Sequence, residues 1–514
     1  MLTFILRRLV ASFFVVLGAT FIAYLLVANA GDPLNEVLGI QDPTQRAQAI
    51  KSITNLLDLD TPPVARYFIW LKGIGGCFVG HCDFGQNIQA QSVGANLGGY
   101  LGNTLKLVAA ATLVAIVLGL TIGVVTALRQ YSGLDYTISF LTFLFFSLPV
   151  FWVGILLKDS IAIKYNDFLQ DSGGHFSWGV IIALAVVMFL LAYSTAGGTR
   201  PRRLLVGGIA AAAAFLVGWY TSQSGWLLDP SFGIVIVGVL AVSIAFGMTT
   251  LTAGIANRKA LYTALTTAAV GIVLYIPLQY FFYTNMSLLR ALLLGVVAIG
   301  VGVGIGYLYG GDDRGLSART GGLTGLGVGL LIFVDRLMRA WRAYSDDPNI
   351  SGRPLATTNP STPNMTGDFW ITTTDTVTHL ILPTITLMLI SLAGYSRYSR
   401  ASMLEVLNQD YIRTARSKGL TERTVIMRHA FRNALIPLAT ILAIDVGALI
   451  GGAVLTETVF GWKAMGSLFQ DGLRRFDPNP VMAFFLVTAV VAVVFNILAD
   501  IAYAALDPRI RVGQ

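Results

Sequence analysis

The sequence predicts an all-α, polytopic integral membrane protein, and composition and hydropathy support this prediction. Hydrophobic residues make up 55% of the 514 residues, whereas charged residues make up only 12% and the mean hydropathy is +0.70. Soluble domains carry about 25% charged residues. Apolar runs of about 20 residues, the length that crosses a bilayer as a helix, recur along the chain. The net charge of +8 lies in short loops between these runs, which indicates membrane topology and not nucleic-acid binding.

The first apolar run directly follows Arg7 and Arg8. Its core is longer than that of a signal peptide, although Ala28-Asn29-Ala30 weakly resembles a cleavage site. We therefore expect residues 1–30 to form an uncleaved first transmembrane helix. Basic residues before the run favour a cytoplasmic amino terminus.

Residues 31–98 are polar, with four basic and six acidic residues, and we expect them to form a small extracytoplasmic subdomain. Both cysteines, Cys77 and Cys82, lie in this segment. Two free thiols are one interpretation, but an oxidising compartment favours a disulfide that closes a short loop. A zinc site is disfavoured because only His81 lies nearby and four ligands are needed.

Eleven further apolar runs are expected to span the membrane, which makes twelve spans in all. They lie near 103–128, 135–157, 178–196, 204–221, 232–255, 261–283, 288–309, 321–338, 379–396, 433–455 and 480–503. Basic loops alternate with acidic or neutral loops, so the positive-inside rule places both termini in the cytoplasm. The run at 321–338 is the least typical, because Asp335, Arg336 and Arg339 lie at its end. The block 178–338 is otherwise rich in Ala, Leu, Val and Gly and is expected to bury few polar groups.

A basic segment lies between the predicted spans 379–396 and 433–455. Between Arg397 and Arg432 there are eight Lys or Arg and three acids, a net charge of +5, so the segment is expected in the cytoplasm. Thr414-Ala415 followed by Gly419 indicates a helix, a break and a second helix. Such a segment suits a protein that docks from the cytoplasm; the alternative is an ordinary solvated loop that only sets orientation.

Several separated blocks resemble one known family. They are MLTFILRRL at the start, residues 103–124, 147–157 and 379–389, the stretch from SRASMLEVLNQDYIRTARSKGL to RHAFRNALIPL, GGAVLTETVFGW, and LDPRIR. Together they resemble the membrane permeases of ABC importers for dipeptides, oligopeptides and nickel, in the order of that family. The resemblance covers residues 1 to about 157 and 379–514, and it implies a type I ABC importer permease core of six helices plus about six inserted helices.

The resemblance implies a division of the chain into six parts. These are a first transmembrane helix (1–30), an extracytoplasmic subdomain (31–98), core helices 2–3 (99–157), an inserted transmembrane block (158–338), an extracytoplasmic loop (339–378), and core helices 4–6 with a cytoplasmic coupling loop (379–514). An even number of inserted spans leaves the topology of the core unchanged.

The resemblance also implies roles for particular residues. Contact with the ATPases is expected from Arg413, Thr414, Ala415, Arg416, Lys418, Gly419 and His429. Arg413 stands where the general permease signature has Glu, and Ile436-Pro437 comes later than in that signature. Asp445, an acid within a span, either lines the pathway or pairs between helices, and Glu457 is expected at a gate or at the contact with a binding protein.

The predicted function is that of a permease subunit in an ATP-driven importer of dipeptides or oligopeptides. Its expected partners are a second permease subunit, two cytoplasmic ATPases that hold ATP and Mg, an extracytoplasmic binding protein and membrane lipid, in the plasma (inner) membrane of a prokaryote. The chain has no phosphate-binding loop of the Gly-rich Lys-Ser/Thr type, so we expect no enzyme activity and no cofactor of its own. Alternatives are a nickel or haem importer permease, a twelve-span secondary transporter, and a structural membrane scaffold.

Overall fold

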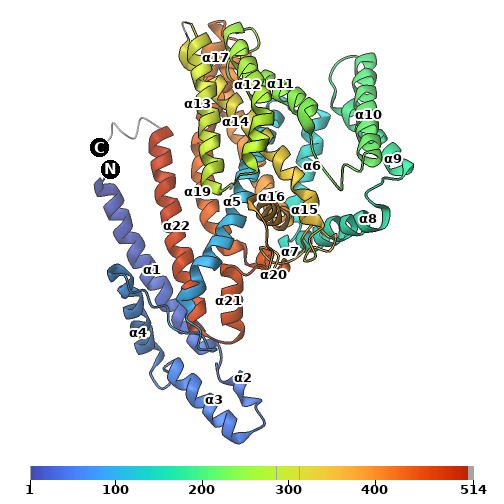
Figure 1. Cartoon of the computed structure of the whole chain (residues 1–514). Helices are drawn as coiled ribbons and strands as arrows, with labels where there is room; N and C mark the ends of the chain where they lie inside the picture. Colours follow the sequence, from blue (N-terminus) through green and yellow to red (C-terminus); the bar gives the residue numbers. More distant parts are fainter. Residues whose placement is uncertain (1, 285, 312, 507–514) are drawn as a thin grey trace. The chain divides into compact units, whose positions relative to one another are not determined.

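The computed structural model describes residues 2–284, 286–311 and 313–506, and they form helices joined by loops (Figure 1). Within these ranges the β pairing consists of one isolated bridge, between Gln86 and Ser92. The prediction of an all-α fold is thus confirmed. Ten helices are long and apolar enough to cross a membrane, or eleven if one bent pair counts as a span. Most of the LDPRIR motif (507–511) lies outside the described residues.

Contacts divide the chain into two compact units, which we call the core unit and the inserted unit. The core unit comprises Met1–Ile161, Thr357–Pro360 and Leu380–Gln514, and the inserted unit comprises Ala162–Ala356 and Ser361–His379. Helix α16 (Phe369–Leu407) contributes residues to both units. Its first residue comes ten positions before the span predicted at 379–396, so the predicted loop 339–378 is shorter than expected.

The amino-terminal part of the core unit joins the first span to the polar subdomain. Its helices are α1 (Leu2–Ala30), α2 (Asn35–Leu38), α3 (Pro43–Leu56) and α4 (Pro63–Gly75). Tyr67 of α4 is 1% exposed, and its hydroxyl lies 3.0 Å from the Thr20 hydroxyl of α1. Tyr24, Trp70 and Met482 complete the same cluster, so α4 is fastened to α1 and to α22 (Pro478–Leu506).

Helices α5 (Val93–Leu128) and α16 approach each other closely in the core unit. A Cβ atom added at Gly119 would lie 2.7 Å from Cβ of Tyr395, and one added at Gly123 would meet Ser399 in the same way. Small residues at such crossings let two membrane helices come into backbone contact. The crossing connects the middle of the bundle to the basic segment after α16.

The run predicted as one span at 135–157 is broken, which corrects the sequence analysis. Helix α6 (Gly133–Ser147) ends before Leu148-Pro149, and the chain from α7 (Val150–Leu157) onward turns by 104°. Leu148 adopts an extended conformation, as steric conflict with a following proline favours. A π-helical stretch, Lys158–Ile163, follows α7.

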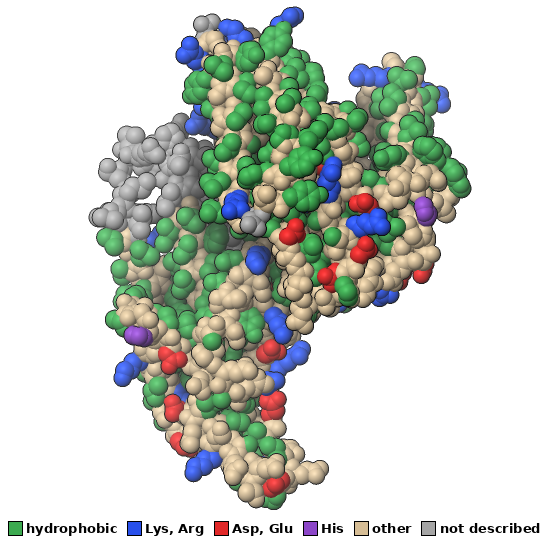
Figure 2. All heavy atoms as spheres, in the orientation of Figure 1, with side chains coloured by type: hydrophobic (Ala, Val, Ile, Leu, Met, Phe, Trp, Pro, Cys, Tyr) green, Lys and Arg blue, Asp and Glu red, His purple; other side chains and the backbone are tan. Residues whose placement is uncertain are grey.

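The inserted unit consists mainly of long apolar helices. They are α8 (Lys164–Ser172), α9 (Trp178–Thr195), α10 (Arg200–Gln223), α11 (Gly233–Thr252), α12 (Arg258–Phe282), α13 (Leu288–Tyr309), α14 (Arg314–Arg339) and the short α15 (Trp341–Ser345). Helix α9 packs on α10, and α11, α12 and α14 share a core that includes Val237, Ala268 and Val328. Figure 2 shows green hydrophobic side chains over α12 and α13, with blue basic side chains at their upper ends.

Glycines on α13 and α14 allow these two helices to touch along their backbones. A Cβ atom added at Gly302 or Gly321 would collide with the carbonyl group of the other glycine. Gly306 and Gly325 face backbone atoms of Ala318 and Ala298 in the same way. This packing needs no hydrophobic driving force, which is absent between helices in lipid.

The remainder of the core unit follows α16. It comprises α17 (Asp410–Ser417), α18 (Glu422–Thr424), a π-helical turn at Val425–Ala430, α19 (Phe431–Gly452), α20 (Val454–Val459), α21 (Met465–Arg474) and α22. Helix α19 matches the span predicted at 433–455, although several of its side chains lie outside the described residues. Two of the twelve predicted spans are not among the ten candidate spans of the structure. One is α19, and the other is the bent pair that begins with α6.

Candidate functional site

The stretch 410–430, which we call the coupling segment, is fixed to the core unit by apolar side chains. Ile412 and Ala415 lie on the buried face of α17, three residues apart, as an amphipathic helix requires. They pack in one cluster with Ala127 at the end of α5, Met403 of α16 and Ala434 of α19. The segment therefore sits on the ends of three long helices.

The break predicted inside the coupling segment lies at Gly419. Its backbone has φ +74°, a conformation that glycine adopts without the steric cost of a side chain. The preceding turn is closed by the amide of Lys418, which donates to the Thr414 carbonyl at 3.0 Å, and by the amide of Gly419, which donates to the Arg416 carbonyl at 2.9 Å. A new helix begins just after, with Thr421 as its N-cap.

The exposed face of the coupling segment is basic. Arg413, Thr414, Arg416 and Lys418 are exposed, and His429 on the π-helical turn is partly exposed. Nη2 of Arg416 lies 2.7 Å from a carboxylate oxygen of Glu422. This hydrogen bond lowers the pKa of Glu422 and raises that of Arg416.

Two further features of the segment concern its apolar side chains. The apolar side chains of Leu420 and Met427 are about 40% exposed (41% and 40%) beside the basic groups. Ala415, expected among the contact residues, instead lies inside the apolar cluster. It can hold the segment in place but offers no surface.

Glu457 is buried at the junction of three helices. One of its carboxylate oxygens accepts a hydrogen bond from the Thr104 hydroxyl of α5 at 2.8 Å, and the other accepts from the amide of Gly466 at 2.6 Å. Gly466 lies in the first turn of α21, where free amides and the helix dipole favour a negative charge. Glu457 is 1% exposed, and its two hydrogen bonds connect α20, which carries it, to α5 and α21.

Asp445 lies midway along α19 and is partly buried. Its carboxylate is near Tyr395 of α16, and the two side chains interact electrostatically. This position is compatible with both roles considered for Asp445, pairing between helices and lining a pathway.

The subdomain at 31–98 carries the predicted disulfide and a buried carboxylate contact. Cys77 and Cys82 are bonded to each other. Asp477, 1% exposed before α22, accepts hydrogen bonds from the amides of Ile88 at 2.6 Å and Asn479 at 3.2 Å. Burial raises the pKa of Asp477 to about 6. The subdomain is thus attached to the start of α22 through a buried carboxyl group, whose charge Arg475 offsets only in part.

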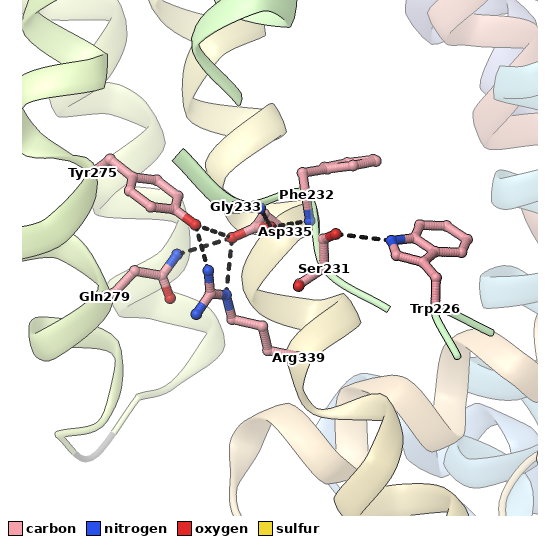
Figure 3. A network of polar contacts seen from close by, with 8 residues as sticks. All are labelled: Trp226, Ser231, Phe232, Gly233, Tyr275, Gln279, Asp335 and Arg339. Atoms are coloured by element: carbon pink, nitrogen blue, oxygen red, sulfur yellow. Dashed lines mark hydrogen bonds and ion pairs between the residues drawn. The ribbon is translucent and has the colours of Figure 1, made fainter. Parts of the chain in front are cut away.

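The inserted unit contains a polar network that the sequence analysis missed (Figure 3). Asp335 of α14 is fully buried and receives hydrogen bonds from the Phe232 amide at 2.7 Å and the Tyr275 hydroxyl at 2.7 Å. Arg339 forms an ion pair with it at 3.1 Å, and Gln279 contributes a longer bond. The expectation that 178–338 buries few polar groups was wrong here, because donors from the start of α11 and from α12 lie far from Asp335 in sequence.

The family match covers the part of the chain that holds the coupling segment, Asp445 and Glu457. Residues 329–512 match the family described as binding-protein-dependent transport system inner membrane component. This match and the relatives below confirm the resemblance to peptide importer permeases that was found in the sequence.

Three curated relatives are named as peptide transport permeases. The oligopeptide transport system permease protein OppB of Mycobacterium bovis is 46% identical over 156 residues, which are 30% of this chain and 48% of the relative. The protein AppB of Bacillus subtilis, also an oligopeptide transport system permease protein, is 47% identical over 27% of this chain and 43% of its own. The dipeptide transport system permease protein DppB of Escherichia coli K12 is 48% identical over 27% of this chain and 40% of its own. The chain thus spans about half the length, or less, of the relatives it matches.

Proposed function

We propose that this chain is a permease subunit of an ATP-driven importer that takes up dipeptides or oligopeptides from an extracytoplasmic binding protein. The observation that carries the proposal is the coupling segment, a basic exposed face on an apolar anchor, within the stretch that matches the transport family. The peptide substrate class rests on the names of the relatives. Both termini are assigned to the cytoplasm on the distribution of basic loops.

In the proposed mechanism, the apolar side chains under the coupling segment transmit the movement of the docked ATPases to the membrane helices. Two cytoplasmic ATPases bind ATP and Mg, close on each other, and carry the coupling segment with them. Since Ile412 and Ala415 pack on the ends of α5, α16 and α19, the segment moves together with these helices. A second permease subunit supplies the opposite wall of the pathway, and an extracytoplasmic binding protein delivers the peptide.

The test is charge reversal of the coupling segment in the complete complex, reconstituted in vesicles. The double variant Arg416→Glu/Lys418→Glu is expected to lower substrate-stimulated ATP hydrolysis and uptake by about tenfold or more, because like charges brought together on docking are strongly unfavourable. Gly419→Pro is expected to act in the same direction, since proline cannot adopt φ +74°. Arg342→Glu, on the exposed face of α15, is the matched control.

A charge swap separates docking from local structure. Arg416→Glu/Glu422→Arg keeps an ion pair at this site but moves the positive charge to another position. If docking depends on where the charge lies, the swap stays impaired while its thermal stability matches that of the wild type. Wild-type transport in the double variant, in Gly419→Pro and in the swap contradicts the coupling assignment.

A panel of substrates decides between the proposed function and its alternatives. Uptake of labelled dipeptides and oligopeptides that needs ATP and the binding protein supports the proposal. Uptake restricted to nickel chelates or haem identifies the alternative importer. Uptake driven by an ion gradient without ATPases identifies a secondary transporter.

A further inference from the structure

A cavity lies among α12, α13 and α14 of the inserted unit, with a volume of about 350 Å³. Its walls are almost entirely apolar, and its rim includes Leu274, Leu292 and Leu330, which are 43%, 60% and 55% exposed. All three helices are candidate membrane spans. A hollow of this kind faces acyl chains in a bilayer, and no polar wall holds water in it.

The cavity reaches the backbone of α13 at Gly295. A Cβ atom added there would meet no other atom within 4 Å, so the space above this glycine is open. Gly300, on the same helix, is also open but does not line the cavity. The two glycines therefore form a matched pair for experiments.

An incompletely paired cation follows, on α14, the cavity-lining residues Ile332 and Phe333. Arg336 of α14 is only 6% exposed, and its guanidinium carbon lies 4.1 Å from the centre of the Tyr283 ring. Nε of Arg336 has no hydrogen-bond partner among the described residues. The adjacent carboxylate, Asp335, is paired with Arg339. Burying a cation without an anion is costly, and the aromatic ring offsets part of that cost.

One aromatic side chain connects the cation to the cavity. The guanidinium carbon of Arg336 lies 5.5 Å from the centre of the Trp370 ring. The same ring packs against Phe282 and Phe333 at centroid distances of 5.2 and 5.0 Å, and both phenylalanines line the cavity. Trp370 thus lies between the guanidinium group of Arg336 and two side chains that line the cavity.

We propose that the inserted unit binds one anionic phospholipid, with an acyl chain in the α12–α13–α14 cavity and its phosphate against Arg336. The cavity takes the apolar part, which a bilayer supplies at high concentration. The phosphate supplies the anion that Arg336 lacks among the described residues, and guanidinium–phosphate contacts are among the strong charge-assisted hydrogen bonds. Basic pockets between transmembrane helices recognise anionic headgroups by the same physical principle.

The test measures lipid retention by the full chain, purified in detergent. The protein is titrated with phosphatidylglycerol or with phosphatidylcholine of identical acyl chains, and bound lipids are counted by native mass spectrometry. We expect the wild type to retain one phosphatidylglycerol with about tenfold preference over phosphatidylcholine, the size of one charge-assisted contact.

Two pairs of variants separate the contributions of the cavity and the cation. Gly295→Leu fills the cavity and is expected to lose the retained lipid, whereas Gly300→Leu keeps it. Arg336→Gln is expected to lose the headgroup preference but to keep phosphatidylcholine binding, whereas Arg342→Gln, at an exposed arginine, keeps both. Arg336→Lys retains the positive charge and therefore part of the preference, which distinguishes lost recognition from misfolding.

Three results overturn the proposal. Equal retention of the two lipids by the wild type shows only nonspecific lipid around the helices. Equal retention by Gly295→Leu and Gly300→Leu shows that the cavity is not the site. A dimer that Gly295→Leu abolishes, with lipid retention unchanged, shows that a second copy of the chain fills the cavity instead.

Discussion

Asp335 of the inserted unit and Asp477 of the core unit are both buried carboxylates, yet their surroundings give them different properties. Asp335 has an arginine partner at 3.1 Å as well as amide and hydroxyl donors. Asp477 accepts only from uncharged amides, and burial raises its pKa to about 6. Burial by itself therefore does not determine what an acidic group does. Asp335 joins helices through a paired charge, whereas burial raises the pKa of Asp477 and makes its charge sensitive to pH.

The largest expected effect is the loss of the compensated carboxylate. Asp335→Ala leaves the Tyr275 hydroxyl and the Phe232 amide without their acceptor and breaks the ion pair with Arg339, and we expect a loss of about 3–5 kcal/mol in the stability of the inserted unit. Thermal unfolding of the full chain in detergent measures it. Asp346→Ala removes an exposed ion pair with Arg342 and is expected to cost less than about 1 kcal/mol. Equal losses of stability in the two variants would show that the buried Asp335 contributes no more than an exposed ion pair.

A smaller effect is expected where the inserted unit is held by packing alone. Gly302→Val places a side chain against the backbone of Gly321, and we expect it to cost about 1–3 kcal/mol. Gly304→Val, on the same helix but facing open space, is the control. Protease resistance of the α13–α14 pair in detergent reports the difference. If both variants behave alike, the close backbone approach does not stabilise this region.

The last expected effect is the pH response of Asp477, which is a gradual slope and not a single loss of stability. Its folded-state pKa lies above its ordinary value of 3.8, so between about pH 4 and pH 6 the folded chain binds a proton that the unfolded chain has released. Stability from this group is therefore greatest at low pH and falls as the pH rises through about 6, by at most about 1.4 kcal/mol per pH unit.

Asp477→Asn is expected to flatten this slope. Melting temperatures of the wild type and the variant, compared from pH 4 to pH 7 in detergent, measure the change. Asp42→Asn, at the exposed N-cap of α3, controls for the removal of a carboxylate at an exposed site. A slope unchanged by Asp477→Asn means that this carboxyl group titrates normally in the fold.

Features set by local sequence were the ones that sequence analysis predicted correctly. Each predicted span except 135–157, which is broken into α6 and α7, corresponds to one helix because apolar length is a local property. Gly419 was identified for the same reason, since a residue that follows a helix and permits positive φ is visible in the chain. The two cysteines, five positions apart, are equally local.

Features that depend on distant partners were missed. The sequence showed Asp335 but not that Phe232 and Tyr275 would supply its donors. The bend at Pro149 was signalled by its residue type, but its angle of 104° depends on tertiary packing. Ala415 was assigned to the surface by resemblance, although its spacing of three from Ile412 indicated the buried face of α17.

The network around Asp335 also has a consequence for the order in which the protein is made. Helix α14 lies in the least apolar of the candidate spans and carries Asp335 and two arginines near its end. Each charged residue opposes entry of a lone helix into the bilayer, at a cost that rises toward its centre. Because α11 and α12 are synthesised before α14, the donors for Asp335 are already present when α14 leaves the ribosome. The donors at the start of α11 and on α12 are thus available to bind Asp335 when α14 enters the bilayer.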